Sequence, residues 1–182
     1  MQILAISGSL RDASSNTTLL RAISHLAPEN AEIVLYKELG NLPHFNPDLD
    51  NEPALPSVTR LRFQLQLADG VIISSPEYAH GLPGALKNAL DWLVSSGETV
   101  DKAFALINAS PRAHHAQEQL AEILSTMAAR IIEKASITVP LLGKNLDEFG
   151  IIANAELSSL LSSAIVEFIN TIEQDKALIK TN

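Results

Sequence analysis

The sequence contains no cysteine, few aromatic residues and no long hydrophobic run. With no cysteine among the 182 residues, a disulfide framework, a thiolate metal site and a cysteine nucleophile are excluded, and a reducing compartment such as the cytoplasm is expected. No hydrophobic run approaches the roughly 20 residues of a membrane span, and no basic segment or cleavage site opens the chain. We therefore expect neither a membrane helix nor a signal peptide.

Positive charge is also scarce. The formal net charge is -8 at pH 7, and the basic residues do not cluster, so the electrostatic basis of nucleic-acid binding is missing. We therefore expect no nucleic-acid partner. A small anion can still bind locally, because backbone N–H groups and a single arginine hold an anion without a positively charged surface.

Short hydrophobic runs alternate with helical patterns along the chain. Hydrophobic residues with strand character occupy residues 3–6, 33–36, 71–73, 103–109 and 131–139. Hydrophobic residues at helical spacing follow each run, at residues 16–27, 58–68, 83–93, 120–127 and 157–172. The alternation predicts a three-layer α/β/α sandwich, doubly wound around a five-stranded parallel sheet. We expect a single domain over residues 1–182 with the flavodoxin-like strand order 2-1-3-4-5.

Two polar loops mark the expected ligand site. In a sheet of this order, ligands bind beyond the carboxyl ends of the strands where the strand order reverses, which is where flavodoxin-like proteins hold FMN. The loops that flank this crevice are residues 7–16 and 74–84, and residues 108–115 lie on the same rim. The predicted topology and the composition of the loops therefore indicate the same ligand site, in the crevice between residues 7–16 and 74–84.

The first of these loops has the composition of a phosphate site. It lacks both GxGxxG and GxxxxGK[ST], since Gly8 is its only glycine. Hydroxyl and amide side chains are concentrated at the start of the following helix, where free backbone N–H groups favour an anion. The guanidinium of Arg11 can donate two hydrogen bonds to a phosphate. The alternative is that Ser14, Ser15 or Asn16 only caps the helix.

The other two loops have features that suit a planar ring. Residues 75–84 contain two prolines and two glycines that can fix the shape of the loop. They can present backbone groups along a ring edge, with Tyr78 packing near the ring. The alternative is a plain connection between a strand and a helix. In the third loop, Ser110 either contacts the ligand or caps the next helix.

Two segments resemble a known enzyme family. The stretches ISGSLRDASSNTTLL, at residues 6–20, and SPEYAHGLPGALKNALDWL, at residues 75–93, are similar to those of the NAD(P)H-dependent FMN reductases, which include quinone, chromate and azo-compound reductases. The resemblance implies FMN as cofactor, NADPH or NADH as co-substrate, and hydride transfer through the flavin to a small acceptor in a ping-pong scheme. It also implies a homodimer or a homotetramer.

The resemblance can be carried over residue by residue. It implies cofactor contacts from Ser9, Arg11, Ser14, Ser15, Asn16, Thr17, Pro76, Glu77, Tyr78, Ala79, His80, Gly81 and Ser110. It requires no catalytic side chain, because the flavin carries the hydride chemistry. The chain departs from the family pattern where Ala79 and His80 replace an amide-containing segment, and where residues 111–114 replace a glycine-rich one. His80 and Arg112 are candidate substrate contacts, Arg112 for the 2′-phosphate of NADPH.

Other residues have simpler interpretations. His114 and His115 are adjacent and therefore about 100° apart on a helix, which suits two ligands of one metal poorly, so we expect no metal site. Trp92 is expected to pack in the core or against a second subunit, and residues 42–53 to form walls that select the acceptor. Two other function classes stay open, a flavodoxin-type one-electron carrier and a flavin-free binding module. The carrier is disfavoured because aromatic residues make up only 4% of the chain.

Overall fold

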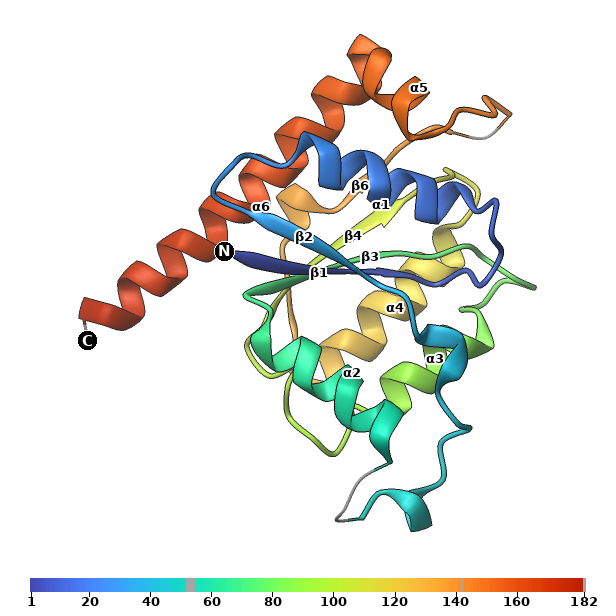
Figure 1. Cartoon of the computed structure of the whole chain (residues 1–182), viewed down its shortest axis with the longest axis vertical. Helices are drawn as coiled ribbons and strands as arrows, with labels where there is room; N and C mark the ends of the chain where they lie inside the picture. The colour runs from blue at the N-terminus through green and yellow to red at the C-terminus, as the bar shows by residue number, and fades with distance from the viewer. Residues whose placement is uncertain (52–54, 142, 182) are drawn as a thin grey trace.

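A parallel β-sheet runs through the middle of the structure and carries helices on both faces (Figure 1). The computed structural model describes residues 1–51, 55–141 and 143–181. The strands are β1 (Gln2–Ser7), β2 (Glu32–Tyr36), β3 (Gly70–Ser74), β4 (Ala103–Asn108), β5 (Arg130–Ile131) and β6 (Ile137–Thr138). Their order is β2-β1-β3-β4-β5, with β6 also paired to β4. The predicted flavodoxin-like order is confirmed.

Helices cover both faces of this sheet. On one face lie α1 (Ser15–Leu26), α5 (Glu148–Ala153) and α6 (Ala155–Thr181), and on the other α2 (Pro56–Leu67), α3 (Gly84–Asp91) and α4 (His114–Thr126) (Figure 1). Short 3-10 helices form at η1 (Leu39–Asn41), η2 (Pro47–Leu49) and η3 (Glu133–Ala135). Among the described residues, no helix combines the length and the apolar character needed to cross a membrane.

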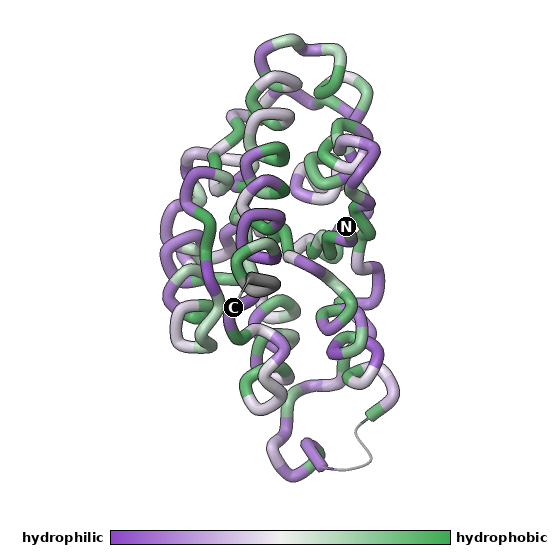
Figure 2. The backbone as a smooth tube through the Cα atoms, turned by 90° about the vertical axis from the view of Figure 1, so that its left-hand side faces the viewer, coloured by the Kyte–Doolittle hydropathy of each residue, from purple (hydrophilic) through white to green (hydrophobic). Residues whose placement is uncertain are grey.

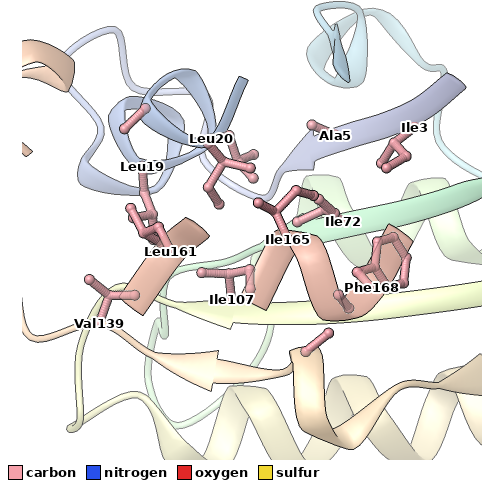
Figure 3. Packing of buried hydrophobic residues seen from close by; sticks show 14 of the residues in the cluster. Ile3, Ala5, Leu19, Leu20, Ile72, Ile107, Val139, Leu161, Ile165 and Phe168 are labelled. Atoms are coloured by element: carbon pink, nitrogen blue, oxygen red, sulfur yellow. The ribbon is translucent and has the colours of Figure 1, made fainter. Parts of the chain in front are cut away.

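Alternating side chains of the strands build two hydrophobic cores. Ile3 and Ala5 of β1 belong to the core under α1 and α6, whereas Leu4 and Ile6 belong to the core under α2 and α3. Successive side chains of a strand point to opposite faces of the sheet, which explains this division. Figure 3 shows the first core, with Phe168 of α6 packed inside it. Along the helices, hydrophobic and hydrophilic residues alternate (Figure 2), as expected when one face lies against a sheet.

The predicted fifth strand at residues 131–139 is not continuous. The structure has two short strands there, β5 and β6, separated by η3. At the break, the hydroxyl of Ser136 accepts a hydrogen bond from the N–H of Leu106, at 3.0 Å, and donates one to the carbonyl of Ile132, at 2.9 Å. A side chain thus replaces part of the backbone ladder, and both pieces still pair with β4.

The helices differ from the sequence prediction in several respects: α4 begins at His114 instead of near residue 120, and α6 continues to Thr181 beyond residue 172. Helix α5 was not predicted, because six residues are too few to show a clear helical period. It begins after Asp147, whose side chain accepts a hydrogen bond from the N–H of Gly150 at 2.7 Å. Pro83, predicted in the first turn of α3, is instead the residue before that helix, which starts at Gly84.

Polar contacts anchor the long loop between β2 and α2. Arg62 of α2 donates a hydrogen bond to a carboxylate oxygen of Asp50 at 2.8 Å and another to the carbonyl of Trp92 at 2.7 Å. The hydroxyl of Ser95 donates to the other oxygen of Asp50. The side chains of Asp50 and Arg62 are only 11% and 16% exposed, so this ion pair is largely shielded from water. Of the predicted acceptor walls at residues 42–53, residues 52 and 53 lie outside the described residues.

Replacing Asp50 by asparagine is expected to lower the free energy of unfolding at pH 7 by about 1–3 kcal/mol, because Arg62 loses its charged partner. The hydroxyl of Ser95, followed by Arg62, holds the pKa of Asp50 below its ordinary value. A carboxyl group of this kind stabilises the fold above its ordinary pKa of about 3.9 and loses that contribution as the pH falls further. Urea unfolding at several pH values should show the difference between wild type and Asp50→Asn shrinking below about pH 4. A difference that stays constant with pH would contradict this prediction.

Candidate functional site

A pocket of about 390 Å³ lies beyond the carboxyl ends of the central strands. We call it the main pocket. It is lined by Ser15, Asn16, Ser75, Pro76, Glu77, Asn108, Ala109, Ser110, Arg112 and Ala113. These residues come from the start of α1, from the loop after β3, and from the end of β4 with the loop that follows it. The structure therefore has a pocket at the predicted place, where the strand order reverses between β1 and β3.

The first turn of α1 closes one end of the main pocket. Ser14 is the N-cap of this helix, since its hydroxyl accepts a hydrogen bond from the N–H of Thr17 at 3.4 Å. The capping alternative therefore holds for Ser14. Ser15 and Asn16 line the pocket, and within the described residues their N–H groups have no hydrogen-bond partner. The side-chain oxygen of the buried Asn16 accepts a hydrogen bond from the hydroxyl of Ser74 at 2.9 Å, which ties α1 to the end of β3.

The other residues predicted for the phosphate line a second pocket, of about 380 Å³, on the β2 side of the same loop. Ser9, Arg11 and Thr17 lie there, together with Arg21 of α1 and Lys37, which follows β2. The residues of the first loop and of the start of α1 that the resemblance implies for the cofactor are therefore not gathered in one pocket: Ser15 and Asn16 line the main pocket, whereas Ser9, Arg11 and Thr17 do not.

Gly8 allows the loops after β1 and β3 to approach each other closely. Its N–H donates a hydrogen bond to the carbonyl of Ser74 at 2.8 Å. A Cβ atom on Gly8 would lie 2.5 Å from the Oγ of Ser75, 2.9 Å from the Cβ of Ser75 and 3.1 Å from a methyl group of Leu86. No side chain fits there unless one loop moves, so Gly8 sets the spacing of the pocket walls.

The tip of the loop after β3 is a tight, exposed hairpin. Tyr78 and Gly81 exchange two backbone hydrogen bonds of 3.0 Å, and between them Ala79 and His80 have φ angles of 50° and 60°. Such a turn usually carries Asn-Gly, because other residues are strained at positive φ. Tyr78 is 56% exposed. None of these four residues is among those that line the main pocket in the described part of the chain.

Two hydrogen bonds clamp the same loop to α4. The carboxylate of Glu77, which lines the main pocket, accepts a hydrogen bond from the N–H of Ala116 at 2.9 Å. This bond is the main reason why the pKa of Glu77 lies below its ordinary value. The side-chain oxygen of Gln119 accepts a hydrogen bond from the N–H of Leu82 at 2.9 Å. The wall of the pocket is thus held by α4 as well as by its own strand.

The loop after β4 is a turn organised by a buried amide. The side-chain oxygen of Asn108 accepts a hydrogen bond from the N–H of Ser110 at 2.9 Å, and its nitrogen donates to the carbonyl of Ala113 at 3.2 Å. The hydroxyl of Ser110 accepts a hydrogen bond from the N–H of Arg112 at 3.2 Å. Ala113, the N-cap of α4, has no side-chain cap. Ser110 therefore closes a turn and lines the pocket, and does not cap the helix.

Three histidines gather beside these two loops. The rings of His80 and His115 are stacked, with centroids 4.4 Å apart and planes 20° apart, and the centroids of His114 and His115 are 4.0 Å apart. Within the described ranges, no group of three or more His, Cys, Asp or Glu side chains is placed to hold a metal ion. The ring of His80 contacts α4 and does not line the main pocket.

Sequence reasoning did not single out Ser75, Asn108 or Gln119 as site residues. The first two have a signal in the sequence, because each is a polar residue at the end of a buried hydrophobic strand, where ligands of such sheets bind. Gln119 has no such signal. It lies on a helix and reaches the loop after β3 only through tertiary packing.

Comparisons with known proteins show the family of the chain. Residues 1–141 match the family of NADPH-dependent FMN reductases. The quinone reductase of Escherichia coli K12 is 37% identical over 94 residues, which are 51% of this chain and 50% of that protein. The CrdA subunit of the NADH:(hydroxy)cinnamate reductase of Vibrio ruber is 35% identical over 151 residues, 80% of this chain and 72% of that subunit. The chain thus spans about half the length of the first curated relatives that it matches.

A solved structure extends the similarity over nearly the whole chain. The flavoenzyme FerB of Paracoccus denitrificans, an NAD(P)H:(acceptor) oxidoreductase, superimposes with a TM-score of 0.84 at 28% identity. The superposition covers 95% of this chain and 97% of FerB. The family match at residues 1–141 includes all the residues that line the main pocket. The chain therefore belongs to the NADPH-dependent FMN reductase family.

Proposed function

We propose that the protein is an FMN-dependent NAD(P)H oxidoreductase that passes a hydride from a nicotinamide to a small acceptor. The observation that carries the proposal is the main pocket, which has free backbone donors at the start of α1 and two clamped loops at its other end. The quinone reductase of E. coli and FerB support this activity, and the former supports a quinone as the acceptor.

The residues of the main pocket fit an FMN molecule. At one end, the free N–H groups of Ser15 and Asn16 and the positive end of the α1 dipole suit a phosphate group. At the other end, Pro76 and Ser110 belong to the two loops between which a flavin ring would lie. When bound there, FMN would supply the hydride chemistry, which no amino-acid side chain provides.

The protein residues would then bind and orient the ring. Glu77 is the acidic residue in the pocket lining, and its carboxylate is engaged by the N–H of Ala116. This hydrogen bond holds the pKa of Glu77 below its ordinary value and positions the loop after β3 against α4. The N–H groups of Tyr78 and Gly81 are used within the hairpin. Of the N–H groups in this segment, that of Glu77, a residue that lines the main pocket, would therefore be the donor that stabilises negative charge on the ring.

Replacing Arg11 by alanine is expected to weaken FMN binding about tenfold or more, since a hydrogen bond between charged groups contributes about 1.5–3 kcal/mol. The exposed side chain of Arg11 has no carboxylate partner within the described residues and can turn toward a phosphate at the start of α1. Titration of the apoprotein with FMN, followed by flavin fluorescence, measures the effect. Arg21→Ala is the control, because it removes a cation from the second turn of α1 in the same neighbouring pocket. An equal loss in both variants would contradict a specific phosphate contact from Arg11.

Flavin uptake and turnover test the proposed function directly. We expect a yellow protein that reduces a quinone with NADH or NADPH, with parallel initial-velocity lines that indicate a ping-pong scheme. A protein that stays colourless after FMN addition and desalting would overturn the proposal and favour a flavin-free binding module. A yellow protein that exchanges single electrons and does not oxidise NAD(P)H would favour the flavodoxin-type carrier.

We further propose that the chain acts as one FMN-binding domain, residues 1–182, in a cytoplasmic homodimer or homotetramer. The lack of cysteine supports a reducing compartment. The homo-oligomer is what the resemblance of residues 6–20 and 75–93 to the FMN reductases implies. Light scattering of the purified protein measures the number of subunits, and a monomer would contradict this part of the proposal.

A further inference from the structure

Arg112 is a cation without a carboxylate partner at the edge of the main pocket. Six other basic side chains form ion pairs within the described residues, among them Arg60 with Glu38 and Arg62 with Asp50, whereas Arg112, like Arg11, forms none. Within the part of the chain that the structure describes, the guanidinium of Arg112 forms no ion pair and no hydrogen bond. In a chain with a net charge of -8, an unpaired guanidinium beside a ligand pocket is available to an anion.

The turn after β4 holds the backbone of Arg112 in a defined position. Its N–H donates to the hydroxyl of Ser110 at 3.2 Å, and the N–H of Ser110 donates to Asn108 at 2.9 Å. Asn108 is only 4% exposed and also bonds the carbonyl of Ala113, at 3.2 Å. The backbone on both sides of Arg112 is therefore tied to one buried side chain, while the guanidinium itself is exposed.

Within the described residues, no carboxylate forms an ion pair with Arg112. Glu77 is the acidic residue of the pocket lining, and its carboxylate already accepts a hydrogen bond from the N–H of Ala116. The other titratable side chains that face Glu77, from the hairpin tip and from α4, are the imidazoles of His80, His114 and His115, which carry no negative charge in either protonation state. Glu77 keeps its own negative charge, but its carboxylate is held by the N–H of Ala116 and not by Arg112. This side of the pocket thus presents an exposed guanidinium that no carboxylate pairs with in the described residues.

We propose that the pocket selects acceptors that carry a carboxylate or a sulfonate, with Arg112 as the residue that determines this specificity. The proposal rests on the proposed function, in which nicotinamide and acceptor use the same pocket in turn. The planar guanidinium would bind the anionic substituent through paired N–H···O hydrogen bonds and orient the acceptor ring. A neutral acceptor lacks this contact, so its KM should be higher.

Steady-state kinetics of the FMN-loaded protein test the proposal, with NADH as donor and two matched acceptors, 1,4-naphthoquinone and 1,4-naphthoquinone-2-sulfonate. We expect the ratio of kcat/KM, sulfonate over neutral quinone, to fall about tenfold in Arg112→Gln, through the KM of the sulfonate. Arg112→Lys should keep part of the preference. Lys134→Gln removes a positive charge from a side chain that is 84% exposed and should keep the wild-type ratio. Equal ratios in wild type and Arg112→Gln would overturn the proposal.

Binding without turnover provides a second measurement. Naphthalene-2-sulfonate is not reduced, so its binding to the oxidised, FMN-loaded protein can be followed through the NMR signals of His80, His114 and His115. We expect binding to Arg112→Gln to be at least about tenfold weaker than to wild type. Equal affinities would overturn the proposal even if the kinetic ratio changed.

The 2′-phosphate of NADPH is another source of the same anionic chemistry. NADPH and NADH are therefore compared as donors, with the neutral quinone as acceptor. A loss in Arg112→Gln that is confined to NADPH, with an unchanged acceptor ratio, would overturn the assignment to the acceptor. Failure of the proposed function is distinguishable, because the protein would then take up no FMN or reduce no quinone, whereas failure of this inference alone leaves both intact.

Discussion

Replacing Gly8 by alanine is expected to weaken FMN binding by at least about tenfold and to lower the free energy of unfolding by about 1–3 kcal/mol. The new Cβ atom would lie 2.9 Å from the Cβ of Ser75 and 3.1 Å from a methyl group of Leu86. Rotation of the Ser75 hydroxyl cannot relieve the contact with the Cβ of Ser75, because that rotation does not move the Cβ atom. The loop after β1 or the loop after β3 must therefore shift, which changes the shape of the main pocket. FMN titration measures the first effect and urea unfolding the second.

Gly84→Ala is the matched control for this substitution. A Cβ atom on Gly84 would meet nothing within 4 Å, and Gly84 is the first residue of α3. Both variants add one methyl group to a glycine next to the loop after β3, but only Gly8→Ala creates a clash. If both variants weakened FMN binding equally, or if Gly8→Ala bound FMN like wild type, the steric explanation would be wrong.

Replacing Trp92 by alanine is expected to lower the free energy of unfolding by about 3–5 kcal/mol, the usual cost of removing a large buried ring. Trp92 directly follows α3 and is 0% exposed. Its indole N–H donates a hydrogen bond to the carbonyl of Pro43 at 2.8 Å, and its ring meets Phe45 edge-on with centroids 5.0 Å apart. Of the two predicted places for Trp92, the core of its own chain is therefore the one observed.

Two further variants show whether this loss comes from burial. Phe63 is 56% exposed on α2, so Phe63→Ala removes an aromatic ring at the surface and should change the free energy of unfolding by about 0.5 kcal/mol or less. Trp92→Phe keeps an aromatic ring but loses the bond to Pro43, and should fall between the two. The explanation fails if Trp92→Ala and Phe63→Ala have the same urea midpoint.

Much of the fold could be predicted because buried parallel strands leave a strong local pattern. The stretch from Ile3 to Ile6 is hydrophobic on both faces, and the structure places it between two cores. The interruption at residues 131–139 could not be predicted in the same way. It depends on a hydrogen bond from the N–H of Leu106 to the side chain of Ser136, residues that are far apart in the sequence.

The sequence by itself determined the sheet order, the edge of the sheet where the pocket lies, and the polar character of the start of α1. These features follow from short stretches of chain and from the few allowed connections between strands. Only the tertiary structure decided which polar residues share a pocket, with Ser15 and Asn16 in the main pocket and Arg11 outside it. It also decided that Gln119 clamps the loop after β3. The physical reason is that the direction of a side chain, and its partner from a distant segment, depend on how the whole chain packs.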